Sequence, residues 1–186
     1  SDSFTYAASD GTGSTNATVT LTIAPVNDNA PVIDAAQNFA IAEDIPNFTV
    51  VGTVTATDVD PGSTFGNWMI VGGDPAAVFA INSATGQITI ADNSTLDFDT
   101  SPTSYALSVT TSDGTNSSAP ETVTVNLTDV NDIAPVIDPA QSFNIPENIA
   151  NLAVVDTVAA SDADTTGEPR QNWMIVGGDP TGVFAI

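Results

Sequence analysis

One long motif occurs twice in this chain, and its spacing limits the size of the folding unit. Residues 67–81 read NWMIVGGDPAAVFAI and residues 172–186 read NWMIVGGDPTGVFAI, an offset of 105 residues. The segments VNDNAPVID and VNDIAPVID start at Val26 and Val130, an offset of 104 residues. A period of this length is too long for a solenoid repeat and matches one small β-sandwich domain. We therefore expect tandem domains of this kind.

Within one period, apolar residues alternate with polar ones, as they do in half-buried β-strands. Residues 122–128 read TVTVNLT and residues 17–23 read ATVTLTI, so every second side chain is apolar. We expect one face of each strand to be buried and the other to be exposed. About seven short strands in about 100 residues predict an all-β fold of tandem Greek-key β-sandwiches with an Ig-like architecture. Further short strands are expected at residues 67–71, 79–81 and 87–91.

The charge of the chain and its missing residue types exclude several functional classes. The 186 residues include 23 Asp and Glu, one basic residue (Arg170), no His and no Cys, for a net charge of -22. Without His or Cys, the usual nucleophilic triads and the thiolate or imidazole zinc sites are excluded, and we expect no enzyme. The negative charge argues against nucleic acid as a partner, and no apolar segment is long enough for membrane insertion. Oxygen-only binding of divalent cations remains.

The repeats divide the chain into one whole unit and two partial ones. Residues 30–132 make a complete repeat, residues 1–29 match only its last two strands, and residues 133–186 stop in the middle of the next repeat. The reading that we favour is an excerpt of a longer protein. The other reading is a head-to-tail fibre, in which residues 1–29 of one chain complete the half-repeat at 133–186 of another by strand addition.

Several motifs that recur in order resemble cadherin repeats. They are the linkers VNDNAP and DVNDIAP, the pairs DVD and DAD, and the segments IPEN, LDFD, FAINSATGQITI and YALSVTTSDG. The resemblance covers essentially the whole chain and implies cadherin-like sandwiches that bind calcium between successive domains. Calcium takes about six to eight oxygen ligands, which these motifs supply. The Thr- and Ala-rich composition is similar to cadherin-like repeats of large bacterial adhesins, so we expect an extracellular, secreted or cell-surface location, in a bacterium.

The resemblance implies three calcium ions at the second linker, residues 129–133. Ile133 replaces an Asn of the family pattern, and we expect little effect because that position contributes only its backbone carbonyl. The first ion would be held by Glu43, Asp97, Asp99 and Asp132. The second would be held by Glu43, Asp99, Asp129, Asp132 and Asp164, and the third by Asn131, Asp162 and Asp164. The linker would also contribute the backbone carbonyls of Val130 and Ile133.

The first linker, residues 26–29, carries the downstream half of the same ligand set. This half could hold an ion of the third type alone, whereas the other two ions would need carboxylates from a preceding domain. Pro25 stands where the family pattern has its first Asp, so we expect this linker to be the weaker one. The implied ligands are Asn27, Asp28, the carbonyl of Asn29, Asp58, Asp60 and Asp113.

The predicted function is a calcium-rigidified, extended structural or adhesive segment, because ions shared between two domains turn binding energy into stiffness. The expected partners are calcium ions and neighbouring repeats or identical chains. The alternative is a carbohydrate-binding or homophilic adhesion module, with glycans as partners. It needs exposed aromatic side chains, but aromatics make up only 6% of the chain, and strand alternation places Trp68 in the core. Glycoside hydrolysis by Asp97 and Asp99 is disfavoured, since no cleft-forming insertion accompanies them.

Overall fold

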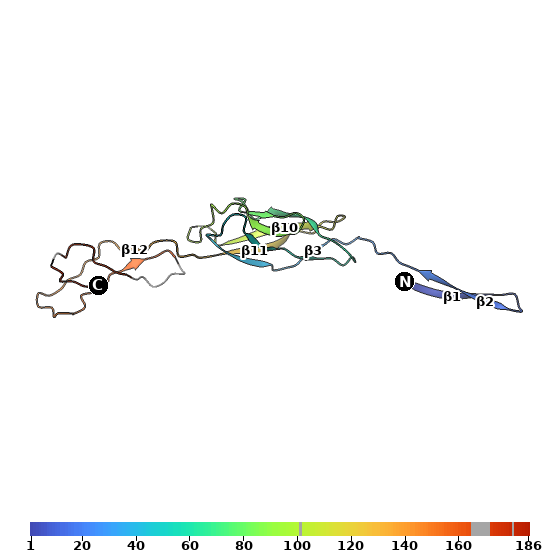
Figure 1. Cartoon of the computed structure of the whole chain (residues 1–186), viewed down its shortest axis with the longest axis horizontal. Helices are drawn as coiled ribbons and strands as arrows, with labels where there is room; N and C mark the ends of the chain where they lie inside the picture. The colour runs from blue at the N-terminus through green and yellow to red at the C-terminus, as the bar shows by residue number, and fades with distance from the viewer. Residues whose placement is uncertain (101, 165–171, 180) are drawn as a thin grey trace.

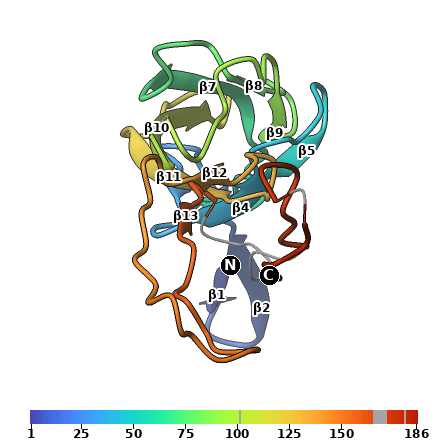
Figure 2. The same cartoon turned by 90° about the vertical axis from the view of Figure 1, so that its left-hand side faces the viewer.

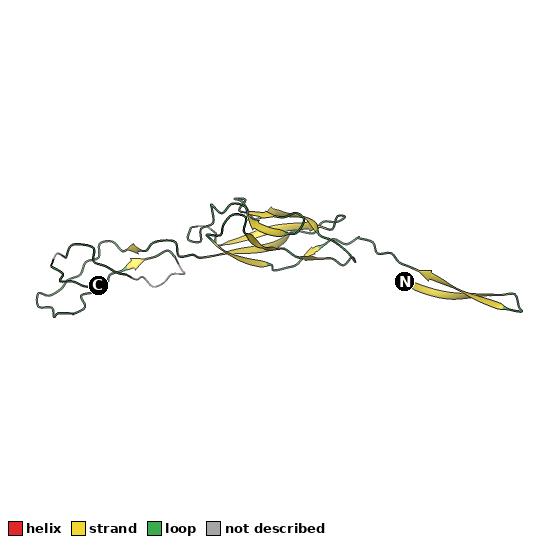
Figure 3. Ribbon diagram, in the orientation of Figure 1, coloured by secondary structure: helices red, strands yellow, loops and turns green. Residues whose placement is uncertain are grey.

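The computed structural model describes residues 1–100, 102–164, 172–179 and 181–186, and these ranges contain strands, turns and loops but no helix. The all-β prediction is therefore confirmed. Figures 1 and 3 show three parts in a row: a long two-stranded hairpin, a packed sandwich and a loop-rich C-terminal segment. The described residues hold no helix that is long and apolar enough to cross a membrane.

The first part is an antiparallel hairpin of β1 (Asp2–Ser9) and β2 (Ser14–Leu21), paired from Asp2 with Leu21 to Ser9 with Ser14. The expected strand at residues 17–23 is present over most of its length, but its apolar face is not buried. Leu21 is 56% exposed and Ile23 is 88% exposed. The burial expected for this strand is wrong here, because no second sheet pairs with or covers the hairpin in the described residues.

The middle part is a sandwich whose sheets face each other, with β10 (Ser104–Ser112) and β11 (Glu121–Thr128) on one side and β5 (Val50–Thr53) and β9 (Gln87–Ile90) on the other (Figure 2). Strand β4 (Asn38–Ala42) runs parallel to β11, and the other neighbours run antiparallel. One sheet has the order β4 (Asn38–Ala42), β11 (Glu121–Thr128), β10 (Ser104–Ser112) and β7 (Gly66–Gly72). The other contains β5 (Val50–Thr53), β9 (Gln87–Ile90) and β8 (Phe79–Ile81), and β3 (Val32–Ile33) pairs with β6 (Ala56–Thr57). Counting β3 with β4 and β5 with β6 as interrupted strands gives the seven strands that were predicted.

The hydrophobic core belongs entirely to the sandwich. In β11, Val123, Val125 and Leu127 are buried, as their alternation with polar residues predicts. Trp68 is only 4% exposed, so it is a core residue and not a surface platform for a sugar. The other buried apolar residues are Ile33, Ile41, Val54, Val78, Phe79, Ile88, Ile90, Leu96, Tyr105, Leu107 and Val109. All of them lie within the predicted repeat 30–132, although the exact repeat boundaries stay a prediction.

The described residues of the C-terminal part have little regular structure. The strands found there, β12 (Val136–Ile137) and β13 (Ala160–Ser161), form a short antiparallel pair. Residues 172–176 repeat the NWMIV of β7, but they are not a strand. In the sandwich this segment pairs with β10, for example Ile70 with Val109. The described part of the C-terminal segment offers no strand in the place of β10.

Candidate metal sites at the two linkers

The second linker is assembled at one edge of the sandwich because β4 and β11 are parallel neighbours. Ala42 is paired with Thr128, so the next residues, Glu43 and Asp129, leave the sheet at the same edge. Asp97 and Asp99 lie in the loop between β9 and β10. Residues far apart in the sequence therefore meet where the linker begins.

Glu43 is hydrogen-bonded to two different segments at this edge of the sandwich. Its side chain is only 5% exposed. One carboxylate oxygen, Oε1, accepts a hydrogen bond of 2.7 Å from the backbone N–H of Val130, and the other, Oε2, accepts one from the backbone N–H of Phe98. The buried carboxylate thus joins the linker to the acidic loop.

Two groups of three carboxylates share Asp99. Oxygen atoms of Glu43, Asp97 and Asp99 lie within 4.8 Å of one another, and so do oxygen atoms of Asp99, Asp132 and Asp164. Each group could hold a metal ion. The two groups together contain carboxylates from the sandwich, from the linker and from the segment after the linker. The backbone N–H of Ile133 also donates to Oδ2 of Asp164 over 3.0 Å.

The electrostatics of the shared group favour a cation. Burial raises the pKa of Asp99, and the nearby carboxylates of Asp164, Asp129 and Glu43 raise it further. Burial, followed by the charges of Glu43 and Asp164, also raises the pKa of Asp132. Asp99 Oδ2 is a buried atom without a hydrogen-bond donor in the described structure. A bound cation would offset both the repulsion and the missing donor.

Asp97 is also bonded within its own loop, and Asp162 and Asn131 have weaker or no described bonds to the carboxylate groups. A hydrogen bond from the hydroxyl of Thr100 lowers the pKa of Asp97. Asp162 Oδ1 accepts a weak bond of 3.4 Å from the backbone N–H of Asp164. The side chain of Asn131 is exposed, and no described hydrogen bond links it to the carboxylates. Val130 and Ile133 contribute backbone N–H groups here, and their carbonyls stay predicted ligands.

At the first linker, Asp60 organises the backbone. Its Oδ2 atom accepts hydrogen bonds from the N–H groups of Asp28, at 3.0 Å, and Asn29, at 2.8 Å. The side-chain amide of Asn29 donates to Oδ1 of Asp60 and to Oδ1 of Asp28, both at 3.0 Å. The bonds from Asn29 lower the pKa of Asp60, which favours the ionised carboxylate that a metal needs.

Asp58 and Asp113 are fixed by turns. Asp58 Oδ1 accepts the N–H of Asp60 at 2.9 Å. Asp113 Oδ1 accepts the N–H groups of Thr115 and Asn116, each at 2.7 Å. These backbone bonds, with that of Asn116 the strongest, lower the pKa of Asp113.

Three oxygen atoms at the first linker are buried without a hydrogen-bond donor in the described structure: Asn27 Oδ1, Asp58 Oδ2 and Asp113 Oδ2. Buried polar atoms in proteins are normally paired. An all-oxygen set of one amide and two carboxylates suits a hard cation such as calcium. The residues present therefore fit the ion that the sequence implies.

Sequence reasoning missed Asn116. Its side-chain amide donates to the backbone carbonyl of Asn29 over 2.9 Å, which connects the turn of Asp113 to the linker. The one available signal was a difference between copies, because SDGT is followed by Asn116 in one copy and by Gly13 in the other.

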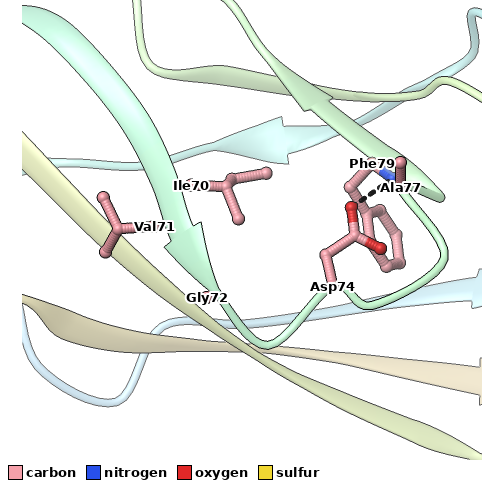
Figure 4. Close-up of a pocket in the computed structure, with 6 residues that line it drawn as sticks. All are labelled: Ile70, Val71, Gly72, Asp74, Ala77 and Phe79. Atoms are coloured by element: carbon pink, nitrogen blue, oxygen red, sulfur yellow. Dashed lines mark hydrogen bonds between the residues drawn. The ribbon is translucent and has the colours of Figure 1, made fainter.

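A separate hollow lies beside the turn after β7 (Figure 4). The carboxylate of Asp74 accepts the N–H groups of Val78, at 2.8 Å, and Phe79, at 2.9 Å. Asp74 is thus used within its own turn, as its Asp-Pro sequence indicates. The residues that line the hollow are Ile70, Val71, Gly72, Asp74, Ala77 and Phe79.

Comparison with known proteins agrees with this fold. The model of the cadherin domain matches residues 37–128. Protocadherin-11 X-linked from Sus scrofa is 35% identical over 179 residues, covering 92% of this chain and 16% of that protein. Human Cadherin-7 is 35% identical over 180 residues, covering 88% of this chain and 22% of that protein. The chain thus spans less than a quarter of either relative.

Solved structures of cadherins are also similar to this chain. The crystal structure of mouse cadherin-23 EC22-24 has a TM-score of 0.59 and 32% identity, covering 88% of this chain and 54% of that one. The human desmocollin-1 ectodomain has a TM-score of 0.65 and 26% identity, covering 83% of this chain and 30% of that one.

The fold and the acidic linkers define a class of β-sandwich modules that have clusters of acidic residues at their ends. Residues 37–128 belong to the cadherin domain family. The family resemblance predicted from the motifs is therefore confirmed. The relatives named here are animal proteins, so they give no support for the bacterial source that the composition suggested.

Proposed function

We propose that this chain is a calcium-binding structural and adhesive segment of an extracellular or cell-surface protein. Calcium at the linkers holds successive cadherin sandwiches in an extended rod. The observation that carries this proposal is the position of Asp99, which belongs both to the carboxylate group within the sandwich and to the group that reaches across the linker to Asp132 and Asp164.

The proposed mechanism is a change in charge balance at the second linker. Without metal, burial and then the repulsion between neighbouring carboxylates disfavour the charged forms of Asp99 and Asp132, and both raise the pKa of each residue. A divalent cation supplies the opposing charge. Because its ligands come from both sides of the linker, the free energy of binding also restricts how the two sides move. The residues that would hold the ions there are Glu43, Asp97, Asp99, Asp129, Asn131, Asp132, Asp162 and Asp164, with the carbonyls of Val130 and Ile133.

At the first linker the proposed ion is of the third type. The buried oxygens of Asn27, Asp58 and Asp113 that lack donors support it. Asp28, Asp60 and the carbonyl of Asn29 complete the proposed ligand set.

Small-angle X-ray scattering of the chain with calcium and with a chelator tests the proposal. We expect a longer maximum dimension and a narrower distribution of shapes with calcium. Asp132→Asn should remove most of this difference, because Asp132 lies between the two sides of the second linker. Glu121→Gln removes the same charge from the start of β11, at the far end of that strand from the linker, and should behave like the wild type. Identical scattering with and without calcium would contradict the proposal.

A second candidate function is head-to-tail assembly by strand addition, and the hairpin supports it. Phe4, Tyr6 and Leu21 are 53–56% exposed. Their counterparts in the sandwich are Leu107, Val109 and Val125, which are fully buried beneath the opposite sheet. A second chain could cover the exposed face with its residues 133–186. Light scattering with size-exclusion chromatography is the test, and a monodisperse monomer in calcium would exclude the fibre.

A further inference from the structure

The two linkers differ at one position that bears on metal binding. At the first linker, the side-chain amide of Asn29 donates to Asp28 Oδ1 and Asp60 Oδ1, both at 3.0 Å. At the second linker, the equivalent residue is Ile133, which offers only its backbone N–H to Asp164. Asp60 is therefore held through both of its oxygens by Asn29, whereas Asp164 receives only a backbone N–H from the equivalent residue, Ile133.

A second side chain holds Asn29 from the other direction. The amide of Asn116 donates to the carbonyl of Asn29 over 2.9 Å, while the backbone N–H of Asn116 donates to Asp113 Oδ1 over 2.7 Å. Asn116 thus connects two predicted ligands, the carbonyl of Asn29 and the carboxylate of Asp113, which lie far apart in the sequence.

The side-chain amide of Asn116 is not required for the turn in which this residue lies. In the hairpin, Gly13 occupies the equivalent position, and its backbone N–H donates to Asp10 Oδ1 over 2.9 Å. The hydroxyl of Ser9 donates to the carbonyl of Gly13 over 2.7 Å, as the hydroxyl of Ser112 does to the carbonyl of Asn116. The same turn therefore forms without a side chain at this position.

We propose that Asn29 and Asn116 are positioning residues that pre-organise the cation site of the first linker, and that Ile133 leaves the second linker without this device. The inference rests on the proposed calcium-binding function. Fixing ligand oxygens before the ion arrives lowers the ordering cost of binding, and residues that hold metal ligands affect affinity strongly. This proposal therefore differs from the sequence-based expectation that Ile at position 133 has little effect.

The test is a calcium titration of the 186-residue chain followed by NMR, because backbone amides report each linker separately. The amides of Asn29 and Asp60 report the first linker, and those of Ile133 and Asp164 report the second. Asn116→Ala and Asn29→Ile should each weaken calcium binding at the first linker by about tenfold, the lower end of the effect of residues that orient metal ligands. Binding at the second linker should not change. Ile133→Asn should strengthen binding at the second linker several-fold.

The outcomes separate the two proposals. If the wild type binds no calcium at either linker, the proposed function fails. If it binds calcium but Asn116→Ala leaves the affinity of the first linker unchanged, the positioning role is wrong. Equal unfolding temperatures in chelator show that a loss of affinity is not a loss of folding. If either loss-of-function variant fails to fold, Ile133→Asn decides, since an unchanged affinity at the second linker would overturn the inference.

Discussion

The backbone N–H of Val130 lies 2.7 Å from Oε1 of Glu43, so the start of the second linker is hydrogen-bonded to the sandwich before any metal binds. Four residues after Asp129, the N–H of Ile133 is bonded to Asp164 in the same way. Asn131 and Asp132 lie between these two fixed points. The proposed binding of calcium at this linker would therefore require the rearrangement of a short segment, not the ordering of a free chain.

Glu43→Gln should weaken calcium binding at the second linker by at least tenfold and leave the first linker unchanged. The substitution keeps the size of the side chain but removes a charge from a site where two unit charges 4 Å apart interact by about 4 kcal/mol at an effective dielectric constant of 20. Isothermal titration calorimetry measures the effect. Glu121→Gln is the matched control, and equal affinities of the two variants would contradict the assignment of Glu43.

Removing calcium should lower the unfolding temperature of the sandwich by about 10 °C or more. A single ion at a concentration of 100 times its Kd stabilises a folded protein by about 2.7 kcal/mol, and 1 kcal/mol shifts the midpoint of a domain of this size by about 4–8 °C. Circular dichroism in calcium and in chelator measures the shift. Magnesium at the same concentration is the control, since a general effect of divalent charge would stabilise the protein equally.

Asp99→Asn should change stability in opposite directions with and without calcium. In chelator the variant should unfold at a higher temperature than the wild type, because burial and neighbouring carboxylates raise the pKa of Asp99 and so disfavour its charge in the folded state. In calcium it should unfold at a lower temperature, because a ligand shared by both carboxylate groups is lost. Thermal unfolding under both conditions checks this, and shifts of the same sign would show that Asp99 does not bind the ion.

The sequence predicted the strands of the sandwich well because alternation reports which face of a strand is covered. Val123, Val125 and Leu127 illustrate this success. The same reasoning failed for Leu21 and for residues 172–176, where the local pattern is nearly or fully the same. A strand needs a paired neighbour and a second layer, and neither is recorded in the local sequence.

The candidate sites, too, were predictable from the sequence only in part. The family resemblance implied that Glu43, Asp97 and Asp99 belong together, and the hydrogen bond from the N–H of Phe98 to Glu43 explains how their loop is held against the start of the linker. The roles of Asn116 and of the Asn29 amide were not predictable in this way. Both depend on which turn lies against the linker, and Asn116 is 87 residues from Asn29 in the sequence.

Gly73→Ala should destabilise the sandwich strongly, by at least about 3 kcal/mol, because strain and overpacking add at this position. Gly73 has a φ of +82°, and a Cβ atom there would lie 1.9 Å from the carbonyl oxygen of Ala106. Gly178 is the matched control, since it has the same φ but no atom within 4 Å of the added Cβ. Urea unfolding measures both variants, and equal effects would mean that the close approach to β10 is unimportant.

Asp74→Ala should destabilise the sandwich by about 1–3 kcal/mol, because buried or half-buried N–H groups that lose their acceptor are costly. Asp74 accepts the N–H groups of Val78 and Phe79, and Phe79 packs edge-to-face on Tyr105 with ring centroids 5.2 Å apart. Asp179 accepts the equivalent N–H groups of Val183 and Phe184 at 3.0 and 2.9 Å, but Phe184 is half exposed. Asp179→Ala should therefore leave the unfolding of the sandwich unchanged, as measured by near-ultraviolet circular dichroism. A similar loss in both variants would show that the capped turn matters without its packing against the core.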